Sequence, residues 1–72
     1  MKLSESQRKV LWNIWNGMSP THHCQGRSQF GGAAQTIASL FRKGFITKNA
    51  LGGVFLTDGG RKWLYDYMNE LD

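Results

Sequence analysis

The chain contains one cysteine, Cys24, so no internal disulfide can hold its fold together. Its 72 residues make a small domain, which buries only about 60% of the surface that the unfolded chain exposes. Stability must therefore come from packing, and a hydrophobic content of 40% is adequate for that. We expect a single domain over residues 1–72, in the cytoplasm, because the chain has a single thiol and no secretory signal pattern. We do not expect a membrane protein, because no apolar run approaches the roughly 20 residues of a span.

The net charge of +4 is unevenly distributed along the chain. Residues 8–62 contain eight lysines and arginines but only one acidic residue, Asp58, and the last ten residues contain three acidic residues. This asymmetry suits a face that binds an anion, such as nucleic acid, and an acidic end that does not. Cations scattered over an ordinary solvated surface would give the same pattern, so both readings stay open.

Apolar periodicity predicts a first helix over residues 4–17. Ser4 and Gln7 have the S-x-x-Q spacing of a capping box, and Gly17 can end the helix in a left-handed conformation. The residues expected on its buried stripe recur at helical spacing, namely Val10, Leu11, Ile14, Trp15 and Met18. Trp12 lies off this stripe, where it either marks a partner surface or widens the buried face.

Glycine and proline interrupt residues 18–32, and regular patterns return after them. A helix is predicted over residues 32–43. Gly31 and Gly32 have no side chains to cover the backbone amides at its start, so these amides could bind an anion. Its apolar side is expected to contain Ala33, Ala34, Ile37, Leu40 and Phe41. Residues 45–48 and 54–57 predict a β-hairpin. Thr57 or Asp58 then caps a last helix, whose Gly59-Gly60 start indicates either a close backbone approach or a frayed turn.

Three blocks in this order resemble the winged helix-turn-helix family. They are Leu3-Ser4-x-x-Gln7-Arg8-x-Val10-Leu11, Ile37-x-x-Leu40-x-Arg42-Lys43-Gly44-Phe45-Ile46 and Val54-Phe55-Leu56-Thr57-x-x-Gly60-Arg61-x-x-Leu64. The resemblance implies a small α+β winged helix with three to four helices and a two-stranded β-hairpin wing over residues 45–57. Family members usually have a full helix before the recognition helix. Residues 18–32 do not fit that pattern, so we expect a helix there that is short, distorted or missing.

The resemblance also implies a function, a small DNA-binding regulator of transcription, of bacterial or phage type. The helix at about residues 32–43 would read double-stranded DNA, with the wing on phosphates or the minor groove. The residues expected to contact DNA are Arg27, Ser28, Gln29, Gln35, Thr36, Ser39, Arg42, Lys43, Lys48 and Asn49. One such small module would bind weakly, so a homodimer or a second partner is expected.

A second function class stays open, a protein-interaction module that keeps the winged-helix scaffold, such as a phage-encoded modulator of a host protein. The irregular segment at residues 18–32 and Trp12 favour this alternative. We expect no enzyme, no metal and no cofactor. His22, His23 and Cys24 are adjacent, and adjacent residues rarely bind one ion together. The chain has no other His or Cys to serve as a fourth ligand, and no separated base and orienting group accompany the thiol.

Overall fold

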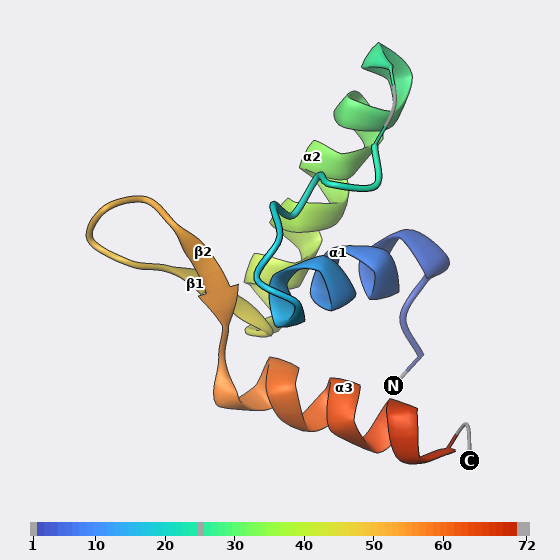
Figure 1. Ribbon diagram of the computed structural model, residues 1–72, viewed down its shortest axis with the longest axis vertical. Coiled ribbons are helices and arrows are strands. Elements are labelled where there is room, and N and C mark those ends of the chain that lie inside the picture. The colour runs from blue at the N-terminus through green and yellow to red at the C-terminus, as the bar shows by residue number, and fades with distance from the viewer. Residues whose placement is uncertain (1, 25, 71–72) are drawn as a thin grey trace.

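Three helices and one two-stranded sheet make up the part of the chain that the structure, a computed structural model, describes (Figure 1). That part is residues 2–24 and 26–70, with side chains for all of them except residues 27–30. The elements are α1 (Glu5–Trp15), α2 (Arg27–Lys43), β1 (Ile46–Lys48), β2 (Val54–Leu56) and α3 (Asp58–Glu70). The predicted α+β class is confirmed, with three helices. None of these three has the length and apolar character needed to cross a bilayer.

The boundaries of α1 follow the predicted signals. The Ser4 hydroxyl accepts a hydrogen bond from the Gln7 backbone N–H at 3.2 Å, and the Gln7 side-chain oxygen accepts one from the Ser4 backbone N–H at 2.8 Å. This is the reciprocal capping box, which satisfies two amides that the first turn leaves unpaired. Gly17 follows the helix with φ +74°, in the left-handed region. The prediction of residues 4–17 is confirmed to within two residues at each end.

The predicted start of α2 at residue 32 is wrong, because the helix begins at Arg27. Gly26, with φ +90°, provides the break, and Gly31 and Gly32 lie inside the helix. The expected anion-binding helix start at Gly31 and Gly32 is therefore not there. A glycine inside a helix costs about 1 kcal/mol relative to alanine, which the packing of later residues in α2 can offset. The end is as predicted, with Gly44 as a left-handed cap at φ +78°.

The segment between α1 and α2 contains turns and no helix in its described residues, 18–24 and 26. The backbone N–H of His22 donates to Ser19 O and that of Cys24 donates to Thr21 O, both at 2.9 Å. The helix expected before the recognition helix is therefore missing from these residues, and residues 27–32 of the irregular segment belong to α2 instead. Asn13 attaches this segment to α1, because its backbone oxygen accepts from the Met18 N–H at 2.8 Å.

The hairpin is antiparallel, with Ile46 opposite Leu56 and Lys48 opposite Val54. Its strands are within one residue of the predicted ones. Thr57 caps α3, because its hydroxyl accepts from the Gly60 N–H at 3.2 Å. Of the two explanations for the glycine pair, close backbone approach is correct at Gly60, where a Cβ would overlap the Phe45 carbonyl group.

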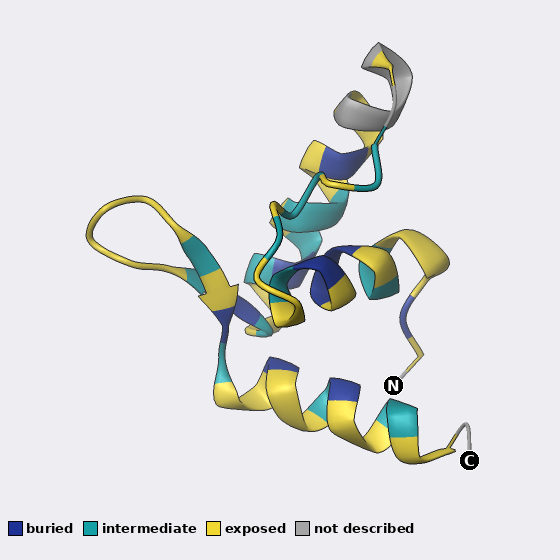
Figure 2. Cartoon of the chain, in the orientation of Figure 1, coloured by how far each residue is buried: buried dark blue, intermediate teal, exposed yellow. Residues whose placement is uncertain are grey.

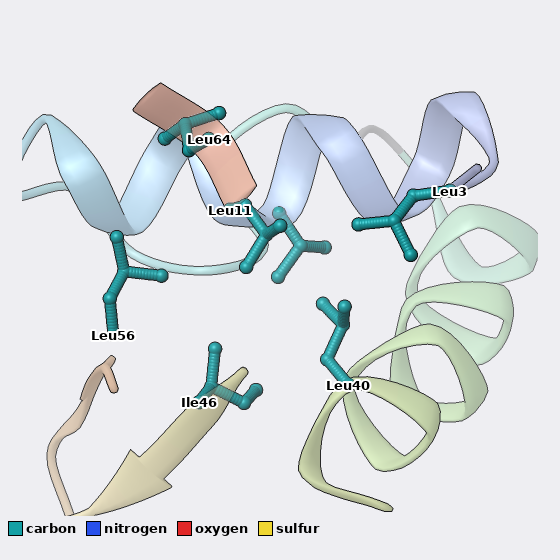
Figure 3. Packing of buried hydrophobic residues seen from close by; sticks show 7 residues of the cluster. Leu3, Leu11, Leu40, Ile46, Leu56 and Leu64 are labelled. Carbon is teal, nitrogen blue, oxygen red and sulfur yellow. The ribbon is translucent and has the colours of Figure 1, made fainter. Parts of the chain in front are cut away.

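The core collects side chains from all five elements and from the segment before α1 (Figure 3). Figure 2 shows the buried positions of α3 on the side that faces α1. The cluster of buried apolar residues consists of Leu3, Val10, Leu11, Leu40, Ile46, Leu56 and Leu64. Two residues expected on buried stripes are exposed instead: Trp15, at 44%, and Ala34. The buried faces of α1 and α2 are therefore narrower than predicted.

Candidate nucleic-acid interface

The exposed side of α2 carries an amide and two cations. Gln35, Arg42 and Lys43 are all exposed, and Arg42 and Lys43 belong to the last turn of the helix. Cations in a last turn also stabilise the helix, because they face its partial negative charge. The arrangement therefore presents hydrogen-bond donors and positive charge on one element that the core holds in place through Leu40.

Thr36 and Ser39 are half-buried, and the side chain of Ser39 faces α1. The Ser39 hydroxyl donates to Thr36 O at 2.7 Å and accepts from the Gln7 amide of α1 at 2.9 Å. The Thr36 hydroxyl donates to Gly32 O, one turn earlier in its own helix, at 3.0 Å. Ser39 was expected to contact DNA. The structure instead makes it a link between α1 and α2.

Lys48 connects the hairpin to the same end of α2. The side chain is exposed at the end of β1, and its Nζ lies 5.7 Å from the centre of the Phe41 ring. A cation over an aromatic ring at this distance is an attractive contact. It brings the Lys48 charge beside the last turn of α2, which carries Arg42 and Lys43. The cations of the hairpin and of α2 thus lie at the same end of α2, the end that carries Gly44.

Asn49 uses its side-chain oxygen inside the hairpin loop. This oxygen accepts from the backbone N–H of Leu51 at 3.0 Å and from that of Gly53 at 2.8 Å. The backbone of Asn49 adds two more hydrogen bonds, one to Gly53 O at 2.9 Å and one from the Gly52 N–H at 3.0 Å. The structure therefore gives Asn49, predicted as a DNA contact, a role in shaping the loop.

Three further predicted contacts, Arg27, Ser28 and Gln29, have side chains outside the described residues. Their backbone forms the first turn of α2. They were placed before the recognition helix in the sequence analysis, and the earlier start of α2 puts them inside it.

The acidic residues of the described chain lie outside α2 and the hairpin. Glu5 is in the first turn of α1 and pairs with Lys9 at 3.2 Å, and the other three are on α3, at Asp58, Asp66 and Glu70. Figure 1 shows α3 along one side of the molecule, with α2 and the hairpin loop extending away from it. The described residues of α2 and the hairpin therefore carry cations and no acidic residue, whereas α3 carries both signs, with Asp58 at its junction with the hairpin and Asp66 and Glu70 further along.

The histidine and cysteine segment is used in packing. Asn13, which is 5% exposed, donates from Nδ2 to Pro20 O at 3.3 Å and to His23 Nδ1 at 2.8 Å. With Nδ1 as an acceptor, the His23 proton is on Nε2, which lies 3.8 Å from the Cys24 sulfur. In residues 2–24 and 26–70, no three His, Cys, Asp or Glu side chains gather as a metal site would require.

A groove of about 470 Å³ runs between α1 and α3, and the sequence analysis did not foresee it. Its walls include Trp12, which is 47% exposed, together with Leu64 and Met68. Arg8 lies at its edge, with its guanidinium carbon 5.5 Å from the centre of the Tyr67 ring. The position of Trp12 off the apolar stripe was the only signal in the sequence.

Leu51 also escaped the sequence analysis. It is 96% exposed, between Ala50 and Gly52 in the hairpin loop. A single leucine among small loop residues was the signal that could have found it.

Comparisons with protein-family models, with curated proteins and with solved structures find no match to this chain.

Proposed function

We propose that this protein binds double-stranded DNA through the exposed side of α2 and the hairpin, in the manner of a winged helix. One observation carries the proposal, the separation of charge. The described residues of α2 and the hairpin contain cations and no acidic residue, and the acidic residues lie on α3 and at the start of α1. A duplex is a dense line of phosphates, so a basic region spanning two elements has the charge that such a partner requires.

The proposed roles follow from exposure. Gln35 is exposed and has the amide geometry that pairs with adenine, and Arg42 suits guanine or phosphate. Lys43 and Lys48 contact phosphates as point charges. Thr36, Ser39 and Asn49 support this surface through hydrogen bonds of their hydroxyl and amide oxygens to other groups of the protein. A transcriptional regulator with a short operator half-site is the function that this small interface supports best.

The test is a salt titration of binding to a duplex, starting at about 50 mM salt. For the wild type, we expect log affinity to fall linearly with log salt concentration. Arg42→Ala and Lys48→Ala should each reduce the slope by about one unit, since each removes one phosphate neutralisation. Lys62→Ala is the matched control, because it removes one exposed cation from α3. Its slope should equal that of the wild type.

Two results would contradict the proposal. One is the absence of duplex binding at about 50 mM salt, where non-specific electrostatic binding is strongest. The other is an equal slope change for Lys62→Ala and Arg42→Ala, which would mean that binding depends on total charge and not on this surface. Circular dichroism of each variant would establish that the helices are retained.

The groove between α1 and α3 favours a second candidate function, a protein-interaction module. Trp12 offers a large apolar contact there, and the Lys9 charge in the groove is paired with Glu5, so the groove suits a mainly apolar partner segment. A partner that survives nuclease treatment in a pull-down, and is lost with Trp12→Ala, would support this candidate over DNA.

A further inference from the structure

The hairpin loop holds a leucine almost completely in solvent. Leu51 is 96% exposed, the highest value among the large apolar side chains of the described residues. A single exposed leucine is common on protein surfaces and by itself indicates nothing. Leu51 differs through its setting, which combines an ordered loop, small neighbours and an adjacent cation.

The loop is ordered by Asn49. Four hydrogen bonds close it, and Asn49 takes part in every one, through its side-chain oxygen or its backbone. One of these bonds fixes the backbone N–H of Leu51 itself at 3.0 Å. Gly52 allows the tight return with φ +86°, a conformation that other residues rarely adopt. Leu51 is therefore held by an ordered loop, so binding would cost little further conformational entropy of the loop backbone.

The neighbours of Leu51 leave it room to enter a narrow space. Ala50 precedes it, and Gly52 and Gly53 follow it, so no large side chain surrounds the leucine. The minor groove of B-DNA is only about 6 Å wide, and a loop with small flanking residues can approach its floor closely. Lys48, exposed at the end of β1, lies next to the loop and can face the phosphates at the groove edge.

We propose that Leu51 inserts as an apolar wedge between two base pairs of duplex DNA, from the minor groove, and bends the duplex. The proposal rests on the proposed DNA-binding function and adds the mode of contact. A duplex has anionic phosphates on its outside, which suit Lys48, and apolar base faces inside, which suit Leu51. Proteins that insert leucine between base steps unstack them and kink DNA by about 20° to 90°. The kink in turn brings more of the duplex against the protein.

Charge and apolar area argue against the other surfaces that a basic loop with a leucine could enter. An anionic membrane would attract Lys48, but a single leucine buries less than one myristoyl chain, which alone gives only marginal membrane binding. A protein pocket would leave the basic region of α2 unused. The duplex uses both Leu51 and the cations, so we assign it as the partner.

The test measures bending and affinity together, on a duplex of about 25 base pairs with a flexible central TA step and a dye at each end. For the wild type we expect energy transfer to rise on binding. Leu51→Ala should remove this rise and lower affinity about tenfold, which corresponds to about 1.4 kcal/mol. The salt slope should not change, because no charge is removed. Leu51→Met should restore most of the bend.

Tyr65→Ala is the matched control, since it truncates a side chain that is 59% exposed on α3. It should leave the bend and the affinity unchanged. Because Leu51 touches little of the protein, its replacement should not alter folding, and an equal urea midpoint for Leu51→Ala would verify this. Asn49→Ala should reduce the bend through loss of loop order, at an unchanged salt slope.

The outcomes separate the two proposals. If the wild type shows a salt-dependent affinity that Arg42→Ala weakens, while Leu51→Ala binds and bends like the wild type, the wedge is overturned and the proposed function stands. If the wild type does not bind the duplex at all, both are overturned. Binding to vesicles of anionic phospholipid that requires Leu51, without an effect of Leu51→Ala on the duplex, would assign the leucine to a membrane and overturn the wedge.

Discussion

The carbonyl oxygen of Phe45 occupies the space where any side chain at position 60 would begin. A Cβ built on Gly60 would overlap this oxygen and come within 3.0 Å of the carbonyl carbon of Phe45. The same oxygen accepts a hydrogen bond from the Thr57 N–H at 3.0 Å, and the Thr57 hydroxyl donates to Gly44 O at 2.5 Å. The start of α3 is therefore packed directly on the chain segment that joins α2 to β1.

This contact predicts different effects on stability when alanine replaces each of two adjacent glycines. Gly60→Ala should lower the free energy of unfolding by about 1 to 3 kcal/mol, since the backbone at Phe45 must move to admit the methyl group. Gly59→Ala should be neutral or stabilising by up to about 1 kcal/mol, because its Cβ would meet only atoms at 3.7 Å or more and alanine favours helix. Urea unfolding of both variants measures the difference, and equal midpoints would contradict the close contact.

The link between α1 and α2 predicts coupling between Gln7 and Ser39. The Gln7 amide donates to the Ser39 hydroxyl at 2.9 Å, and the Gln7 side-chain oxygen serves the capping box. Ser39→Ala should lower stability by about 1 kcal/mol, and Gln7→Ala by more, because it loses both interactions. In a double-mutant cycle the two losses should sum to more than the loss in the double variant.

Ser39→Ala also separates the two roles considered for this residue. If the hydroxyl only joins the helices, duplex affinity at a temperature well below unfolding should match the wild type within a factor of about two. A larger loss of affinity in the folded variant would return Ser39 to the DNA-contacting set.

The hydrogen bonds of Asn13 predict that its side chain holds the segment between α1 and α2 against α1. Asn13→Ala should lower stability by about 1 to 3 kcal/mol, because the buried amide donates to both Pro20 O and His23 Nδ1. His23→Ala removes only one of these bonds and should cost about 1 kcal/mol. Hydrogen exchange at the Cys24 amide, which donates to Thr21 O, should become faster in both variants. Unchanged exchange in Asn13→Ala would show that other contacts hold the segment.

Local chemistry explains which elements were predictable from the sequence. The capping box of Ser4 and Gln7 and the left-handed glycines at 17 and 44 act within a few residues, and the helix ends that depend on them were predicted closely. The start of α2 depends on packing further along the helix, which overrides the local cost of Gly31 and Gly32. Local pattern alone therefore placed this boundary five residues too late.

The candidate site was less predictable than the fold, for a related reason. Gln35 and Arg42 were expected to contact DNA from the side of the helix away from its apolar residues, and both are exposed in the structure. Spacing cannot tell where the neighbouring helix lies, so it put Ser39 on the same side, although α1 reaches it through Gln7. Asn49 has the polar side chain of a DNA contact, but asparagine also bonds readily to backbone amides two to four residues on, as it does here.

Arg8 is a cation of the sequence that we do not expect to contact DNA, because contacts within the protein engage its side chain. Its guanidinium donates to Leu3 O at 2.8 Å and lies over the Tyr67 ring, so it joins the segment before α1 to α3. Arg8→Ala should lower stability by about 1 to 2 kcal/mol. It should leave the salt slope of duplex binding unchanged, whereas Arg42→Ala should reduce that slope with a stability loss below about 1 kcal/mol. Paired urea and salt titrations of the two variants measure this contrast. A reduced slope for Arg8→Ala would extend the DNA surface to α1, beyond the α2 and hairpin region proposed for it.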